Sequence, residues 1–163
     1  MGTRKEKLIV IGGVAAGMSA ASAARRARPD MEIIVFEKGP FISYGACSLP
    51  YYLSKDIQDY RQLIAVSPES AREERRLDVR PGCAATSIDV QRKEVHVHQK
   101  ESGKTERHSY DKLVLAMGAV SIRPPMPGID LQNVFTLRTL EDGIAIRNFI
   151  DWGYSERAEE ALS

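Results

Sequence analysis

Apolar residues form two kinds of pattern over the first forty positions. Largely apolar runs at residues 7–12 and 32–37, rich in β-branched side chains, predict strands that are buried on both faces. Between them, residues 14–28 are rich in alanine and precede Pro29, which predicts a helix that ends before the proline. A strand, a helix and a strand within about 30 residues indicate a βαβ unit with a right-handed parallel pair.

Shorter elements are expected further along the chain. A short helix is predicted near residues 49–53, and Ser67 followed by Pro68 predicts the start of a helix that reaches about residue 76. Short runs with strand character follow, with a hairpin turn at residues 101–104. The expected strands lie at residues 77–81, 84–90, 94–99, 105–110 and 112–116.

The last part of the chain begins with a segment that is unsuited to regular structure. Pro124, Pro125 and Pro127 interrupt any helix or strand, and the sequence TLED from Thr139 then predicts a capped helix over residues 140–150. Together these patterns predict an α/β fold: a Rossmann-like βαβ domain with a small antiparallel β-meander inserted. We expect this domain to cover residues 1–150, with a polar tail at residues 151–163 that could form a frayed helix.

Composition excludes several functional classes. The chain has 163 residues, of which 43% are hydrophobic and 28% charged, enough for one domain with a core. The formal net charge of +1 gives no overall field that would attract nucleic acid or an anionic membrane. No apolar run approaches the roughly 18 residues of a membrane span, and the first apolar run is too short for a signal peptide. We therefore expect a cytoplasmic protein that binds neither nucleic acid nor membrane.

A glycine loop lies between the first predicted strand and its helix. Its sequence is Gly12-Gly13-Val14-Ala15-Ala16-Gly17. Gly12 permits a tight turn, Gly17 lets the helix pack closely on the strand, and the free amides at the helix start can hold a pyrophosphate. Val14 occupies a position where the dinucleotide fingerprint has glycine, so we expect its side chain to displace the phosphates slightly or to leave room for a water.

Glu37 supports the assignment of this loop to a dinucleotide. It ends the second predicted strand, twenty residues after Gly17. A carboxylate there can accept both ribose hydroxyls of an adenosine, which fits FAD or NAD and disfavours a 2′-phosphate. The alternative is a plain strand-to-helix turn beside a surface glutamate.

The two cysteines differ in their surroundings. Cys47 and Cys83 are too few for a disulfide framework and lack zinc-binding spacing, so no metal site is expected. Pro50 can open a helix just after Cys47, and the helix dipole, with Arg25 or Arg26 nearby, would lower the pKa of the thiol. The thiolate is the form that attacks disulfides or peroxides. The alternative is a buried, inert cysteine, and for Cys83 only that interpretation applies.

Several segments resemble one known family. The chain is similar to the first part of the single-cysteine pyridine nucleotide-disulfide oxidoreductases, which include coenzyme A-disulfide reductases, NADH oxidases, NADH peroxidases and persulfide reductases. The resemblance covers residues 7–150. It is carried by GGVAAGMSAA, VFEK, ISYGACSLPYYL, YDKLVLAMGA, RPPMPGI and LRTLEDGIAI, of which the segment around Cys47 is the most specific.

The resemblance implies an FAD enzyme. Electrons would pass from NAD(P)H through the flavin to the Cys47 sulfur, which would reduce a small disulfide such as coenzyme A disulfide, a persulfide or a peroxide, in a homodimer. The implied FAD contacts are the loop from Gly12 to Gly17, Glu37 on the adenosine ribose, Lys38 and Ala85 near the adenosine half, and Ser43, Ala116 and Gly118. The implied coenzyme A contacts are Arg26 and Ser43.

The sequence departs from the family in four respects. Val14, Ala46 and Met117 replace residues that are common in the family, and none of these changes excludes membership. Family members also continue with a second glycine loop for NAD(P)H, and no such loop follows Ile150. We therefore expect the N-terminal FAD-binding portion of a longer protein, which by itself turns over no NAD(P)H and retains FAD weakly.

Two other functional classes remain open at this point. A non-catalytic Rossmann-like module could bind a nucleotide or a partner protein, and Cys47 would then be inert. An NAD-dependent dehydrogenase would fit the glycine loop but would leave Cys47 and its segment unexplained.

Overall fold

The structure is a computed structural model that describes the backbone of residues 4–162 and the side chains as far as Gly153. The chain forms two compact units. The first comprises residues 1–44 and 64–118, and the second comprises residues 45–63 and 119–163.

A parallel sheet forms the centre of the first unit. Its strand order is β3-β2-β1-β7, and every neighbouring pair is parallel. The predicted βαβ unit and its parallel pair are therefore confirmed. The strands are β1 (Lys7–Ile11), β2 (Glu32–Phe36), β3 (Asp78–Arg80) and β7 (Lys112–Leu115), and α1 (Ala15–Ala27) connects β1 to β2.

The predicted β-meander is also confirmed. It consists of β4 (Cys83–Asp89), β5 (Glu94–Gln99) and β6 (Thr105–Ser109), which pair antiparallel in the order β4-β5-β6. The hairpin between β5 and β6 turns at Gly103, where a φ of 67° requires a residue that tolerates the left-handed region. The α/β fold class inferred from the sequence is thus correct.

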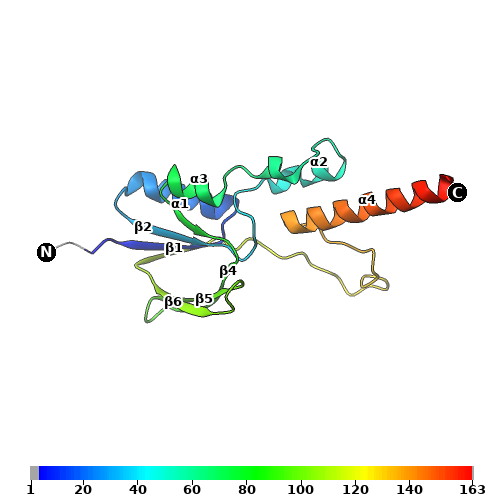
Figure 1. The fold of residues 1–163 in the computed structure, drawn as a ribbon. Helices are drawn as coiled ribbons and strands as arrows, with labels where there is room; N and C mark the ends of the chain where they lie inside the picture. Colours follow the sequence, from blue (N-terminus) through cyan, green and yellow to red (C-terminus); the bar gives the residue numbers. More distant parts are fainter. Residues whose placement is uncertain (1–3, 163) are drawn as a thin grey trace. The chain divides into compact units, whose positions relative to one another are not determined.

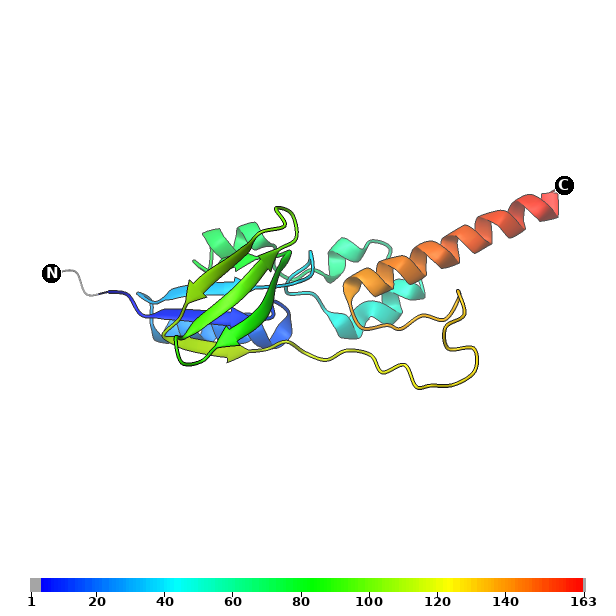
Figure 2. The same cartoon turned by 90° about the horizontal axis from the view of Figure 1, so that it is seen from below.

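The two faces of the parallel sheet are covered by different layers. Helices α1 and α3 (Pro68–Glu73) lie on one face and the meander lies on the other (Figures 1 and 2). Because both faces are covered, β1 and β2 have continuous apolar sequences rather than alternating ones. The helix-side core includes Leu8, Val10, Met18, Ala21, Ile33, Val35 and Leu77, and the meander-side core includes Ile9, Ile34, Phe36, Val95 and Val97.

Helix α3 begins where the sequence predicts and ends earlier. The hydroxyl of Ser67 accepts a hydrogen bond from the amide of Ser70 at 3.1 Å, which caps the helix as expected. The prediction extended the helix to about residue 76. In the structure Arg76 has a φ of 55°, and this left-handed residue turns the chain toward β3.

The second unit is mainly helical. It contains the 3₁₀ turn η1 (Ala46–Ser48), α2 (Leu49–Leu53), the 3₁₀ turn η2 (Tyr60–Leu63) and α4 (Leu140–Leu162). None of the helices in the described part of the chain has the length and apolar character that crossing a membrane requires.

Helix α4 has the predicted start and a longer course. The amide of Asp142 donates to the Thr139 hydroxyl at 3.2 Å, and the Asp142 carboxylate accepts from the Thr139 amide at 2.8 Å, which is a reciprocal cap. The prediction placed the helix over residues 140–150 and left open a frayed helix in the polar tail that follows. The helix continues to Leu162 because those residues include glutamate, arginine and alanine, which favour helix regardless of polarity.

A half-buried histidine links the meander to the parallel sheet. The ring of His108 on β6 lies 4.9 Å from the ring of Phe36, and its Nε2 lies 3.4 Å from a carboxylate oxygen of Glu106. Burial lowers the pKa of His108 below its ordinary value, and the nearby Arg80 charge lowers it further.

This shift predicts a pH dependence of stability. Between the folded-state pKa of His108 and the unfolded value of about 6.5, the unfolded chain binds more protons than the folded chain. The free energy of unfolding should therefore fall as the pH drops from about 7 through that window, and the fall should be smaller in His108→Gln. Urea unfolding at a series of pH values measures both slopes. Identical slopes would show that His108 does not titrate differently on folding.

Candidate nucleotide-binding site and candidate redox cysteine

The glycine loop after β1 is packed without room for side chains at two positions. Gly12 has a φ of 105°, and a Cβ atom there would lie 2.1 Å from the carbonyl oxygen of Ala116. A Cβ atom at Gly17 would lie 1.7 Å from the carbonyl oxygen of Gly12. The start of α1 therefore lies directly against the loop, which brings the helix amides to the carboxyl end of β1.

The start of α1 has the properties of an anion site. Val14 is the N-cap residue and provides no side-chain acceptor, and the first turn carries no acidic residue. The first amides of a helix have no acceptor within the helix, and they lie at the positive end of its dipole. Ala15 and Ala16, which open the helix, are exposed. These amides are arranged to bind phosphate oxygens.

Glu37 connects the end of β2 to the glycine loop. Its side chain is 8% exposed, which contradicts the alternative of a surface glutamate. One carboxylate oxygen accepts from the Gly13 amide at 2.7 Å and the other accepts from the Gly39 amide at 2.8 Å. An ionised carboxylate offers about four acceptor directions, so each oxygen keeps one for a ribose hydroxyl.

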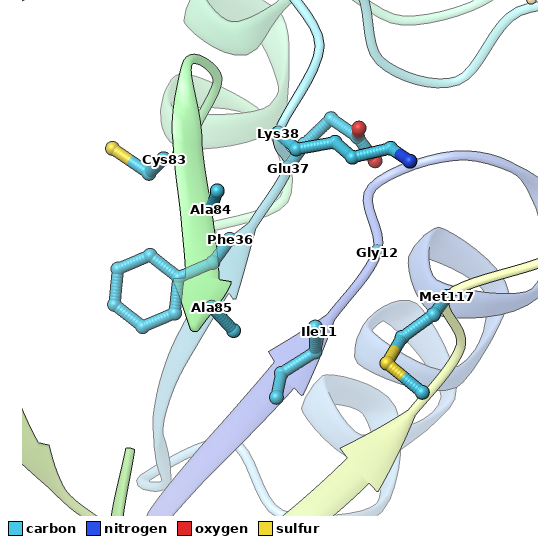
Figure 3. Close-up of a pocket in the computed structure, with 9 residues that line it drawn as sticks. All are labelled: Ile11, Gly12, Phe36, Glu37, Lys38, Cys83, Ala84, Ala85 and Met117. Atoms are coloured by element: carbon cyan, nitrogen blue, oxygen red, sulfur yellow. The ribbon is translucent and has the colours of Figure 1, made fainter. Parts of the chain in front are cut away.

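A cavity of about 230 Å³ lies beside this carboxylate. Figure 3 shows the side chains of Glu37 and Lys38 directed toward the loop at Gly12, whereas that of Cys83 is directed away from it. The structure thus brings together four residues that the sequence predicted: Gly12, Glu37, Lys38 and Ala85. The complete lining is Ile11, Gly12, Phe36, Glu37, Lys38, Cys83, Ala84, Ala85 and Met117.

Five of these lining residues were not predicted as site residues, and among them are Cys83 and Ala84. Cys83 and Ala84 enter the cavity because β4 starts beside the end of β2, where the Cys83 amide donates to the Glu37 carbonyl at 2.8 Å. This contact between β4 and the end of β2 is tertiary, so the sequence alone does not reveal that the two residues line the cavity. Burial raises the pKa of the Cys83 thiol, which keeps it protonated and fits the unreactive role expected for it.

Two further predicted residues, Ala116 and Ser43, lie against the same loop. The Ala116 amide donates to the Ile11 carbonyl at 2.8 Å, and the Ser43 amide donates to the Gly13 carbonyl at 2.9 Å. Ser43 and Gly118 have φ values of 47° and 68°, in the left-handed region.

Arg26 lies away from this cavity, in a second hollow that we call the basic hollow. It has a volume of about 540 Å³ and lies where α1 and α3 end. Arg75 and Arg76 were missed by the sequence analysis, although their place just before a predicted strand is visible in the sequence. The basic hollow is lined by Ser22, Arg25, Arg26, Pro29, Glu74, Arg75 and Arg76.

Arg25 has a structural role in the basic hollow. Its guanidinium donates to the carbonyl oxygens of Pro29, Met31 and Arg76 at 2.7–2.9 Å, which fixes its charge at the end of α1. Arg26 is exposed. The sequence analysis expected one of these arginines to activate Cys47. That expectation stays a prediction, because both arginines belong to the first unit and Cys47 belongs to the second.

Cys47 is a free, exposed thiol in η1. The alternative of a buried cysteine is therefore wrong. Helix α2 begins two residues later with Pro50 in its first turn, as predicted, and the N-cap residue Ser48 makes no side-chain cap. Cys47 belongs to the second unit, whereas the glycine loop belongs to the first. In the described part of the chain, no cluster of three or more potential metal ligands occurs.

Comparison with known families identifies the chain. A model of the family described as pyridine nucleotide-disulphide oxidoreductase matches residues 6–149. The chain belongs to this family. Its members are oxidoreductases, and FAD is the family cofactor. The resemblance inferred from the sequence is confirmed.

Individual relatives agree with this assignment. The chain is 37% identical to an NADH oxidase of Methanocaldococcus jannaschii over 89% of its own length and 32% of the relative. It is 33% identical to a coenzyme A disulfide reductase of Staphylococcus haemolyticus, over 93% of the chain and 34% of the relative. The structure of reduced Bacillus anthracis CoADR-RHD superimposes with a TM-score of 0.87 at 34% identity, covering 91% of this chain and 27% of that one. The chain thus spans about a third of the length of the curated relatives.

The close packing of the glycine loop generates a stability prediction. In the interior of a helix, Gly→Ala normally stabilises by about 1 kcal/mol. Gly17→Ala should instead lower the free energy of unfolding by about 3 kcal/mol, because the new methyl group would overlap the Gly12 carbonyl. Urea unfolding measures the difference. Gly103→Asn is the control, since that turn has open space around it and asparagine tolerates its φ; it should change stability by about 0.5 kcal/mol or less.

Proposed function

We propose that this chain is the FAD-binding and disulfide-reacting portion of a flavin-dependent NAD(P)H oxidoreductase that acts on coenzyme A disulfide through Cys47. The observation that carries the proposal is the 2.7 Å hydrogen bond from the Gly13 amide to the Glu37 carboxylate. This contact supports the proposal, because it joins the Glu37 carboxylate to the loop before α1, and a dinucleotide site requires an acid for the sugar beside amides for the phosphates.

The first unit provides the site for the adenosine half of FAD. The amides at the start of α1 would hold the pyrophosphate, and the remaining acceptor directions of Glu37 would bind the ribose hydroxyls. The adenine would enter the cavity beside Lys38 and Ala85. Ala116 and Gly118, together with Ser43, would lie toward the rest of the FAD. When bound, FAD supplies a two-electron carrier between NAD(P)H and the cysteine sulfur.

Cys47 provides the reacting sulfur. Its thiolate attacks one sulfur of a disulfide, a bond forms between the two sulfurs, and the other half of the disulfide leaves as a thiolate. The exposure of Cys47 allows a disulfide to approach it. A persulfide or a peroxide could react with the same sulfur, and the product with a peroxide would be a sulfenic acid.

Among these acceptors we favour coenzyme A disulfide, because relatives of the chain are coenzyme A disulfide reductases and the first unit has a hollow that suits phosphate groups. Coenzyme A carries several phosphate charges, whereas a peroxide carries none. Arg26 and Arg75 present guanidinium groups in one hollow, and guanidinium groups bind phosphate strongly. The homodimer, the cytoplasmic location and the single domain over residues 1–150 that the sequence predicts stay predictions.

Nucleotide binding tests the first half of the proposal. The chain should bind ADP, and 2′-phospho-ADP should bind at least about tenfold more weakly, because its extra phosphate would lie beside the Glu37 carboxylate. Glu37→Gln should weaken ADP binding by about tenfold, since a ribose hydrogen bond to a charged group is lost. Isothermal titration calorimetry gives these affinities.

A matched control uses the other end of the same strand. Glu32→Gln removes an exposed carboxylate that pairs with Lys7, and it should leave ADP affinity unchanged. Equal affinity for ADP and 2′-phospho-ADP would contradict the role of Glu37. No nucleotide binding at all would favour a module that binds only a partner protein.

A chemical test addresses the second half of the proposal, the reaction of Cys47 with a disulfide. Incubation with coenzyme A disulfide should give a protein that carries one coenzyme A on Cys47, detected by intact-mass and peptide mass spectrometry. Cys83→Ser should form this adduct at the normal rate, because Cys83 is partly buried and its thiol pKa is raised. Cys47→Ser should form none. An adduct located on Cys83, or no adduct, would refute the role of Cys47.

A further inference from the structure

The segment that carries Cys47 has little stability of its own. Cys47 lies in η1, which runs directly into α2, so the orientation of its sulfur follows the placement of this helix. Helix α2 has only five residues. A helix of that length is not stable in isolation, and it depends on packing against another element.

Helix α4 is the element that holds the first turn of α2. Leu49, the first residue of α2, is 2% exposed. Gly143 on α4 lies against it, and a Cβ atom at Gly143 would be 2.8 Å from a methyl carbon of Leu49. The backbone of α4 thus approaches the start of α2 at a point where a larger residue would require the Leu49 side chain to shift. Figures 1 and 2 show the two helices side by side.

A buried arginine on α4 holds the other end of α2. Arg147 is 7% exposed, and its guanidinium donates to the carbonyl oxygen of Tyr52 at 2.5 Å. The same group lies 5.2 Å above the centre of the Tyr52 ring. A cation at the carbonyl end of a helix is favourable, so Arg147 stabilises the last turn of α2.

The arginine is itself fixed by a carboxylate one turn further along α4. Nε of Arg147 lies 2.9 Å from one oxygen of Asp151, whose other oxygen lies 2.8 Å from the Lys55 ammonium group. Hydrogen bonds from Lys55 and Arg147 hold the pKa of Asp151 below its ordinary value, so the carboxylate is charged at neutral pH. Gly143, Arg147 and Asp151 are four residues apart and form one face of α4.

Packing alone does not explain an arginine at this position. Burying a guanidinium carries a desolvation cost, and apolar side chains of similar volume often give equal or greater stability. An arginine adds direction, because its planar group donates at fixed angles to two acceptors at once. Here one acceptor belongs to α2 and the other to α4, so their relative orientation is fixed.

We propose that Arg147 is a positioning residue that orients Cys47, through α2, for in-line attack on a disulfide. This inference rests on the proposed role of Cys47. Disulfide exchange requires the attacking sulfur to approach along the line of the breaking S–S bond, and a displacement of about 1 Å can slow an enzymatic step about a hundredfold.

Two reagents distinguish an effect on the orientation of the Cys47 sulfur from an effect on its exposure. Coenzyme A disulfide requires directed attack, whereas iodoacetamide requires only an accessible thiolate. In a Cys83→Ser background, Arg147→Met should slow the reaction of Cys47 with coenzyme A disulfide about tenfold and change iodoacetamide alkylation by less than about twofold. Arg147→Lys keeps one donor near Tyr52 and should recover part of the lost rate, which also provides a test if the methionine variant does not fold.

The control is the same substitution at an exposed site in the same unit. Arg61 pairs with Asp59 at the surface, with its side chain 76% exposed, and Arg61→Met should react with both reagents at the rates of the parent. An unchanged disulfide rate in Arg147→Met would overturn the inference. Equal slowing with both reagents would also overturn it, because the role of Arg147 would then be structural only.

Failure of the proposed function gives a different result. If the unmodified chain does not react with coenzyme A disulfide at all, the role of Cys47 is refuted, whatever Arg147 does. Hydrogen exchange then decides whether Arg147 orders α2: Arg147→Met should speed exchange of the amides of residues 49–53 about tenfold, and Arg61→Met should not. Unchanged exchange would overturn the positioning claim independently.

Discussion

The nucleotide site depends on the contact between the Gly13 amide and the Glu37 carboxylate. This hydrogen bond joins the loop after β1 to the end of β2, two segments that are adjacent only because their strands pair in parallel. The close approach of Gly17 to the Gly12 carbonyl then fixes the start of α1 beside them. The amides that we propose for the phosphates and the acid that we propose for the sugar are thereby brought together at one end of the sheet, where open α/β folds bind ligands.

The two units use charge in different ways. In the first, the buried charge of Glu37 is satisfied by backbone amides and keeps acceptor directions for a ligand. In the second, the buried charge of Arg147 is satisfied within the protein, by Tyr52 and Asp151, and serves to hold a short helix. The first arrangement suits the binding of a ligand, and the second suits the fixed placement of a side chain such as Cys47, for which we propose a reactive role.

The parts of the site that are local in sequence could be predicted, and the others could not. The glycine loop, Glu37 and the helix after Cys47 depend on neighbours within a few residues, so turn and capping rules located them. The Cys83 and Ala84 lining and the cluster of Arg26 with Arg75 depend on strand and helix neighbours far apart in sequence. The sequence did not indicate that Arg147 is buried, because a lone arginine in a helix is usually at the surface.

The sequence by itself determined the α/β class, the order of the strands along the chain and the family, because apolar periodicity and glycine positions follow directly from backbone geometry. It also determined that Cys47 precedes a helix. Tertiary structure decided which strand neighbours which, that Glu37 is buried on two amides, and that Arg25 is held by three carbonyl groups. These outcomes depend on packing between distant segments, and the free energy of that packing is not encoded in any one local pattern.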